Sequence, residues 1–129
     1  MTKTATAALN GGVFVKLNAS DASNVQAAGA SDTDVIGVTK APAAAGEPVA
    51  VVLLGISGST VIGVASAAIA AGAKVYLAAD GKVRVAPAAG AAAQSVVCVG
   101  VALTPALYAG DNLEIAHRTP VVETIAAAE

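Results

Sequence analysis

One phrase recurs three times along the 129-residue chain, and it limits the folds that the sequence can form. Each copy is an apolar run containing Gly-Val, then a stretch of small residues, then Ala-Gly-x-x and a second apolar run. The copies are Val35–Val38 with Ala45–Val51, Val61–Val64 with Ala71–Leu77, and Val97–Val101 with Ala109–Ile115. The two glycines of a copy lie nine, nine and ten positions apart, and the uneven spacing of the copies argues against a solenoid. The phrase predicts one unit used three times: strand, short connection, turn, strand.

The residues of this phrase suit bent β-structure. Val and Ile are restricted at χ1 and pack well on a pleated surface. The second glycine of each copy precedes a strand, where a turn often requires a positive φ angle. The first glycine lies inside an apolar run, where glycine typically marks a bulge, a bend or a close backbone approach. The sequence therefore predicts a mainly β fold, a small, strongly bent β-barrel or sandwich with one or two short helices and extended termini.

A hairpin is predicted where Asp80-Gly81 separates two alternating runs, residues 75–78 and 83–85. Tyr76 and Arg84 would share one face of this hairpin. Its buried face would carry Val75, Leu77, Val83 and Val85. Alternation of apolar and polar residues also predicts a strand at 13–17, and an apolar run predicts another at 48–54.

Two segments are candidates for the short helices. Ser66–Ala71 precedes Gly72, a residue that often ends a helix, and is predicted to form one or two helical turns. Thr119 as N-cap and Pro120 at the first helical position predict a helix over residues 121–128. A strand docked on a neighbour is an equal alternative for that tail.

These signals divide the chain into three parts. Residues 1–34 are an N-terminal strand or arm followed by a long polar loop, which runs from Asn18 to Asp34. Residues 35–116 hold the three repeated phrases and form the β-rich core domain. Residues 117–129 are a C-terminal tail or arm.

Composition excludes several classes of function. Ala, Val and Gly make up half of the chain, charged residues are 12%, and the net charge is -2. Nucleic-acid binding requires a basic surface and often stacking aromatic rings, whereas this chain has seven scattered Lys and Arg residues and three rings. We therefore expect no nucleic-acid partner. Cys98 is the only cysteine, so no intrachain disulfide can form, and its apolar neighbours predict a buried core residue.

Two windows of 26 residues, 48–73 and 85–110, carry no charge and are long enough to cross a bilayer. Glycine, serine and proline interrupt them, and much of their apolar content is alanine, which adds little insertion energy. No membrane span is therefore expected. No signal peptide is expected either, because no long apolar run follows Lys3.

No catalytic, cofactor-binding or metal-binding residues are predicted. The segment Gly55-Ile56-Ser57-Gly58-Ser59 departs at its last position from the Gly-x-Ser-x-Gly motif of serine hydrolases, and we interpret it as a hairpin loop. His117 is the only histidine, too few for a zinc site, and is interpreted as a surface or interface residue. Asp32 and Asp34 are close enough to share a cation, but a polar loop that carries two acids is the preferred interpretation.

The ordered combination of these motifs resembles a known family. The residues that carry the resemblance are Val35–Val38, Ala44–Val51, Ala70–Tyr76, Gly81–Val83, Val99–Ala102 and Ala109–Asp111. Over roughly Val35 to Ala116 they resemble the capsid cement, or decoration, proteins of tailed bacteriophages. The resemblance implies a small β-rich structural protein that trimerises on the outer surface of an assembled phage head and stabilises the capsid against the expansion forces of packaged DNA.

The same resemblance implies the partners and the location. The partners are the major capsid protein of the same virion and further copies of this chain, with no cofactor and no catalytic residue. The location is the outer surface of the virion capsid, after synthesis in the host cytoplasm. The apolar composition agrees with this, because obligate homo-oligomer interfaces are apolar and closed symmetry protects strand edges.

Two alternatives stay open. A non-catalytic binding module, such as a carbohydrate-binding or host-surface-binding head appendage, is favoured by the polar loop but has few aromatic rings for stacking on sugars. An enzyme would depend on Ser57 as nucleophile, and nothing in the sequence places the only histidine beside it.

Overall fold

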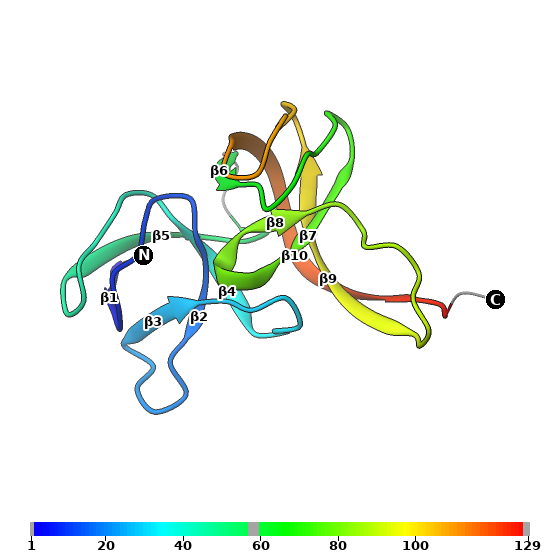
Figure 1. Cartoon of the computed structure of the whole chain (residues 1–129). Coiled ribbons are helices and arrows are strands. Elements are labelled where there is room, and N and C mark those ends of the chain that lie inside the picture. The colour runs from blue at the N-terminus through cyan, green and yellow to red at the C-terminus, as the bar shows by residue number, and fades with distance from the viewer. Residues whose placement is uncertain (1, 57–59, 128–129) are drawn as a thin grey trace.

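The computed structural model describes residues 2–56 and 60–127, and in this part of the chain it is built almost entirely of β-strands (Figure 1). The strands are β1 (Thr2–Ala5), β2 (Phe14–Leu17), β3 (Asn24–Ala27), β4 (Val35–Thr39), β5 (Pro48–Leu53), β6 (Val61–Val64), β7 (Lys74–Leu77), β8 (Val83–Arg84), β9 (Gln94–Ala102) and β10 (Asn112–Ile125). A single 3₁₀ turn, η1 (Ala79–Gly81), is the helical element of the described residues. The predicted mainly β fold is confirmed.

The strands form two curved sheets, one from each half of the chain. Strands β1 to β5 close into a barrel in the order β1-β3-β2-β4-β5, with β1 parallel to β3 and antiparallel to β5. Strands β6 to β10 form a sheet in the order β6-β10-β9-β7-β8. Its two edges meet at a parallel bridge between Ala65 and Val83, where the Ser66 N–H donates to the Val83 carbonyl at 2.8 Å. The second sheet is therefore a barrel whose closure is reduced to one bridge.

The two barrels share one topology. In each barrel the first strand lies between the fifth and the third, and the contact between first and third strands is parallel. Equivalent backbone hydrogen bonds recur as well. The Gly12 N–H donates to the Thr39 carbonyl at 2.9 Å, and the Gly72 N–H donates to the Ala102 carbonyl at 2.7 Å. The fold is thus an internal duplication of a five-stranded unit.

The repeated phrase of the sequence corresponds to a turn that each barrel contains twice. In every copy a strand is followed by one isolated bridge residue and then by a turn with glycine in the left-handed region. The bridge residues are Leu9, Ala43, Ile69 and Ala106, and the turn glycines are Gly12, Gly46, Gly72 and Gly110, with φ angles of 77°, 81°, 86° and 90°. The three predicted turns are confirmed. The sequence does not reveal the copy at Leu9, because the strand before it reads Thr-Lys-Thr-Ala instead of an apolar run with Gly-Val.

Two of the three glycines inside the apolar runs mark close backbone approaches, as predicted, whereas a Cβ atom at Gly63 would meet the side chain of Ile115. A Cβ atom at Gly37 would collide with the carbonyl oxygen of Val52 on the paired strand β5. A Cβ atom at Gly100 would collide with the carbonyl oxygen of Ala116 on β10. Tight curvature of both barrels therefore depends on the absence of a side chain at these positions.

The predicted hairpin at Asp80-Gly81 is present as β7, η1 and β8. Leu77 pairs with Val83, and Tyr76 pairs with Arg84, so the expected register is confirmed. Three of the four side chains expected on the buried face are fully buried, but Val85 is exposed because the chain leaves the sheet after Arg84. That part of the prediction is wrong.

Both predicted helices are absent from the described residues. Ser66–Ala71 is a bent segment without a helical turn, and Ile69 within it exchanges backbone hydrogen bonds of 2.8 and 2.9 Å with Ala106 in the neighbouring loop. Residues 121–125 belong to β10 and pair with β9, so the strand alternative is correct for them. Ala128, the last residue of the predicted helix, lies outside the described part of the chain.

The long polar loop expected from Asn18 to Asp34 is interrupted by β3, which completes the first barrel between β1 and β2. Val25 is the one large aliphatic residue of that strand and is fully buried. The division of the chain into residues 1–34, 35–116 and 117–129 stays a prediction.

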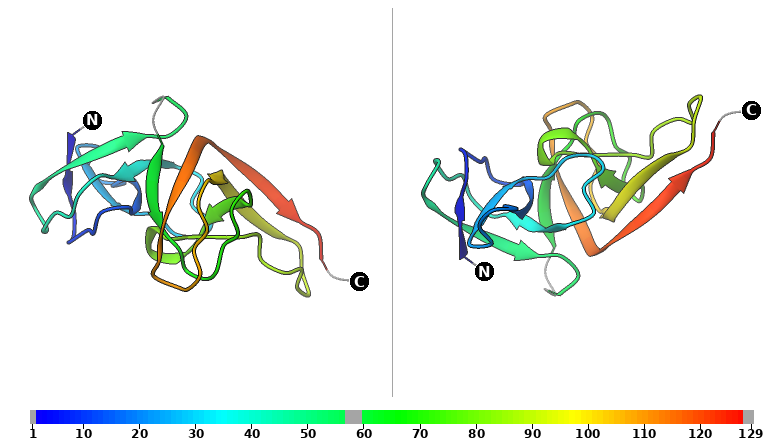
Figure 2. Two further views of the ribbon diagram at one scale, coloured as in Figure 1. Left: turned by 90° about the horizontal axis from the view of Figure 1, so that it is seen from above. Right: turned by 90° about the horizontal axis from the view of Figure 1, so that it is seen from below.

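One hydrophobic cluster continues through both barrels and joins them. Phe14 of β2 is fully buried in it, together with Leu77 of β7 and Ile115 of β10. The Gly81 N–H of the β7–β8 turn donates to the Ala28 carbonyl of the first barrel at 2.7 Å. Figure 2 shows the two halves side by side and the ends of β9 and β10 extending away from them as a two-stranded ribbon.

Candidate functional site

Of the two residues considered for nucleophilic chemistry, His117 is the one whose surroundings the structure describes. Ser57 lies outside the described residues. His117 is half-buried at the junction of the two barrels, where its Nδ1 accepts a 2.9 Å hydrogen bond from the Gly55 N–H. Its Nε2 atom is buried and has no hydrogen-bond partner among the described residues. The imidazole therefore connects the end of the first barrel to β10.

Asp32 connects the loop before β4 to its own backbone and to β2. Its Oδ2 accepts a 2.6 Å hydrogen bond from the Gly29 N–H and forms a 3.0 Å ion pair with Lys16 Nζ. The hydrogen bond from Gly29 and the bond to Lys16 hold the pKa of Asp32 below its usual value. The bond to Asp32 raises the pKa of Lys16. Asp34 is exposed, and no group of three or more metal-ligating side chains occurs in residues 2–56 and 60–127.

A polar contact beside Cys98 fixes the start of the C-terminal ribbon, in which Gln94–Cys98 of β9 pair with Val121–Ile125 of β10. Cys98 is buried, as predicted, in a small cluster with Tyr76 and Val96. The Tyr76 hydroxyl donates a 2.9 Å hydrogen bond to Glu123 Oε1, and Lys74 Nζ lies 3.7 Å from Glu123 Oε2. Burial, followed by the bond to Glu123, raises the pKa of Tyr76 to about 12. The far half of β10 is thus held against β7 although the two strands do not pair.

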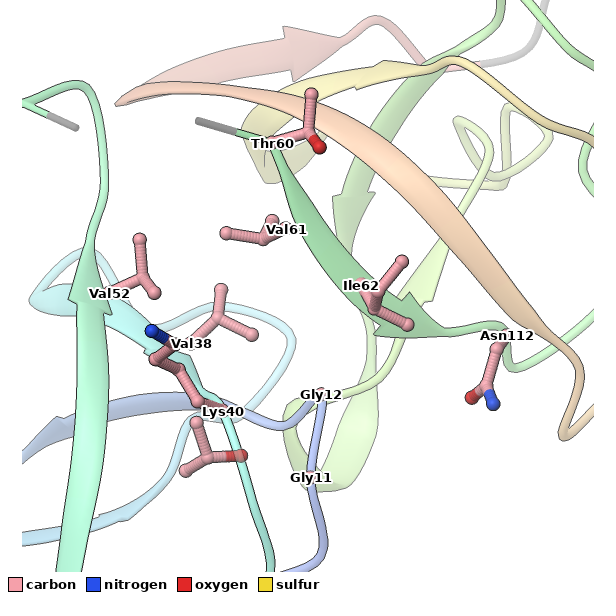
Figure 3. Close-up of a pocket in the computed structure, with 10 residues that line it drawn as sticks. Gly11, Gly12, Val38, Lys40, Val52, Thr60, Val61, Ile62 and Asn112 are labelled. Carbon is pink, nitrogen blue, oxygen red and sulfur yellow. The ribbon is translucent and has the colours of Figure 1, made fainter. Parts of the chain in front are cut away.

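A groove of about 360 Å³ lies between the two barrels (Figure 3). Val38 and Val52 contribute from the first barrel, and Val61 and Ile62 contribute from β6. The loop of the first barrel approaches β6 closely here, since a Cβ atom at Gly12 would lie 2.8 Å from the Ile62 carbonyl oxygen. Polar side chains line it too, from Thr39, Lys40, Thr60 and Asn112, but the described lining includes no carboxylate or imidazole that could serve as a general base.

Among the described residues, eight large apolar side chains are exposed, and five of them lie at two places on the second barrel. On the outer face, Ile62 and Leu103 flank Glu114 on adjacent strands, and Val101 lies two positions before Leu103. We call Ile62, Leu103 and Val101 the outer apolar row. The second place is the loop between β9 and β10, where Leu107 and Tyr108 are 67% and 72% exposed. Surfaces of this kind serve contact with other macromolecules.

Sequence reasoning missed both apolar surfaces. The alternation Val101, Leu103 continues the apolar side of a strand and gives no sign of which face is covered. The signal for Leu107 was present in the spacing of the glycines, since the third copy of the phrase is one residue longer than the others. The two uncharged windows contain β5, β6 and β9, and no helix of the described residues is long and apolar enough to span a membrane.

Comparison with known protein families gives a match over most of the chain. A family model described as "Phage cement protein" matches residues 1–118. The match includes the first 34 residues, for which the sequence motifs offered no resemblance. A comparison with curated proteins found no match.

Proposed function

Since the chain belongs to the phage cement protein family and is a structural protein that stabilises the capsid, we propose that it binds the outer surface of the assembled head. The observation that carries this proposal is the family match over residues 1–118, from the start of the first barrel into β10 of the second. No enzymatic role is proposed.

The charge of the chain supports binding to the outer rather than the inner surface of the head. The inner surface of a filled head faces packaged DNA, and a protein that lies against DNA uses a basic surface to neutralise phosphates. This chain has a net charge of -2 and only seven Lys and Arg residues. Contact with other protein subunits suits it better.

We also propose that the protein acts as a homotrimer on the major capsid protein of its own virion. The outer apolar row supports this, because exposed aliphatic side chains on one face of the second barrel are the kind of surface that homo-oligomers bury. An oligomer would engage several capsid subunits at once, so that each further contact gains from a high effective concentration.

The C-terminal segment is proposed as an arm toward a neighbouring subunit. Val121–Ile125 pair with β9 on one side, and no second strand pairs with them among the described residues. An unpaired strand edge is a template for a further strand. A variant that lacks residues 124–129, which removes the end of this strand edge but keeps Glu123, is expected to keep both barrels folded and to bind heads more weakly. Unchanged binding would remove the arm from the proposal.

The outer-surface proposal is tested by adding the purified protein to intact, DNA-filled heads that lack it. Co-sedimentation with those heads is expected, because only their outer surface is accessible. Binding restricted to opened or empty shells would contradict the proposal. Sedimentation equilibrium of the free protein and of protein released from heads measures the oligomer, with three times the 12.3 kDa chain mass expected in the released fraction.

A further inference from the structure

The loop between β9 and β10 departs from the other three copies of the same turn. The first two residues of the turn are Asn-Gly after Leu9, Ala-Ala after Ala43 and Ala-Ala after Ile69. After Ala106 the chain inserts Leu107 and then begins the turn with Tyr108. Three copies show that the fold is built with small residues here, so the two large apolar residues of the fourth copy are not required by the fold.

This loop is held rigidly. Asp111 Oδ2 accepts hydrogen bonds from the backbone N–H groups of Leu107 and Tyr108, at 3.1 and 3.0 Å. The Asp111 N–H donates to the Tyr108 carbonyl at 3.2 Å, which closes the turn, and the Gly110 N–H donates to the Ala65 carbonyl at 2.8 Å. The backbone of the tip is therefore fixed from both sides before any partner binds.

The two side chains nevertheless point into solvent. Leu107 is 67% exposed and Tyr108 is 72% exposed, and Tyr108 is one of only three aromatic residues in the chain. Asp111 is the one charged side chain of the loop over residues 103–111, and its carboxylate accepts hydrogen bonds from the backbone N–H groups of Leu107 and Tyr108. In Figure 1 the loop lies at the top of the second barrel, beside the loop that joins β6 to β7.

We propose that Leu107 and Tyr108 are the anchor by which this protein grips the capsid, with the two side chains seated in an apolar pocket between major capsid protein subunits. The inference rests on the proposed function and names the surface that performs it. Rigid, exposed aromatic and aliphatic side chains are the residues that dominate protein–protein binding energy when they enter a pocket. Their pre-ordered loop lowers the entropy that binding has to overcome.

The size of the tip favours the capsid over a second copy of this chain as its partner. One large side chain buries about 150–250 Å² at most, whereas a stable pairwise interface needs roughly 800 Å² from each partner. Two side chains therefore cannot hold two copies together. On a head, several copies of this protein present the same loop to the repeating lattice of capsid subunits. Many small contacts then add up to strong binding.

The test measures binding of Leu107→Ala, Tyr108→Ala and the double variant to intact heads that lack the protein. Val85→Ala is the matched control, because Val85 is an exposed aliphatic residue that lies outside the β9–β10 loop, the outer apolar row and the C-terminal segment. Tyr108→Ala is expected to weaken head binding at least about tenfold, with folding and oligomeric state unchanged. Asp111→Ala, which keeps both apolar side chains but frees the loop, is expected to weaken binding less than the double variant does.

The outcomes separate this inference from the proposed function. If the unmodified protein fails to bind heads, the outer-surface proposal fails and the anchor fails with it. If the unmodified protein binds and the double variant binds equally well, only the anchor is wrong. If the double variant loses its oligomeric state in sedimentation, the tip is a contact between copies and the anchor is again wrong.

Discussion

The Gly55 N–H donates a 2.9 Å hydrogen bond to Nδ1 of His117, and this contact joins the exit of the first barrel to the bend in β10. Gly55 has a φ angle of 75°, and a Cβ atom there would collide with Thr119. The first strand of the second barrel starts only a few residues later, at Val61. The only histidine of the chain thus helps to set how the two barrels meet.

Replacing His117 tests this junction. His117→Ala removes the acceptor of the Gly55 N–H and is expected to lower the free energy of unfolding by about 1–2 kcal/mol. His117→Asn, whose Oδ1 atom can accept in place of Nδ1, is expected to lose less. Urea unfolding followed by circular dichroism measures both, with Arg118→Ala, an exposed neighbour, as the control. Equal losses for Ala and Asn would count against the hydrogen bond.

A second prediction concerns Thr39, which is buried. Its hydroxyl bridges the two ends of the turn at Gly12, from the Asn10 carbonyl to the Val13 N–H. Its hydroxyl donates to the Asn10 carbonyl at 2.7 Å and accepts from the Val13 N–H at 3.0 Å. Thr39→Val keeps the shape but leaves both backbone groups unpaired, which is expected to cost about 1–3 kcal/mol of stability. Thermal unfolding compares it with the exposed Thr124→Val. A loss no larger than that of the control would show that the bridge contributes nothing.

A third prediction follows from Tyr76, whose pKa is raised to about 12 from a usual value of 10.0. The folded state keeps the hydroxyl protonated, while the unfolded state loses this proton from about pH 10 upward. The stabilisation is therefore complete below pH 10 and is lost as the pH rises toward 12. Urea unfolding from pH 8 to 11.5 is expected to show a steeper alkaline loss in the unmodified protein than in Tyr76→Phe. Parallel curves would contradict the burial of this hydroxyl.

The acid side depends on Asp32. Its pKa is lowered in the folded protein from a usual value of 3.8, so its stabilisation is present above that value and is lost as the pH falls below it. Asp32→Asn is expected to be less stable at pH 7 and to lose less on acidification than the unmodified protein. Asp34→Asn, at an exposed carboxylate two residues away, serves as the control. Identical acid transitions for Asp32→Asn and the unmodified protein would show that the contacts of Asp32 with Gly29 and Lys16 do not stabilise the fold.

The sequence predicted the features that depend on local conformation. Gly46, Gly72 and Gly110 precede strands because the turns require positive φ, and Asp80-Gly81 makes a hairpin for the same reason. These preferences act within a few residues, so they can be recognised without knowledge of the fold.

The failures arose where a distant strand decides the structure. Ser66–Ala71 contains alanines that favour a helix, but the bridge of Ile69 with Ala106, 37 positions later, takes the backbone hydrogen bonds of Ile69 and holds the segment in a bent loop. β3 was hidden because only Val25 marks it, and its place between β1 and β2 comes from closure of the barrel. The sequence showed three of the four equivalent turns, because β1, the strand before the turn at Leu9, lacks the Gly-Val run.

For the function, too, the sequence indicated one part and the structure was needed for the other. The absence of an assembled catalytic motif in the sequence pointed to a structural role, and the family match supports that role. The tip at Leu107 and Tyr108 could not be identified from apolar residues alone, because the sequence does not show which side chains the fold covers. It became recognisable when the four equivalent turns were compared in space.

The central claim is that this protein strengthens the phage head from outside. The most direct measurement is the temperature at which filled heads release their DNA, with and without the added protein. A higher release temperature is expected with the unmodified protein, a smaller increase with the Leu107→Ala, Tyr108→Ala double variant, and the full increase with the Val85→Ala control. An unchanged release temperature at saturating occupancy of the unmodified protein on the heads would contradict the claim.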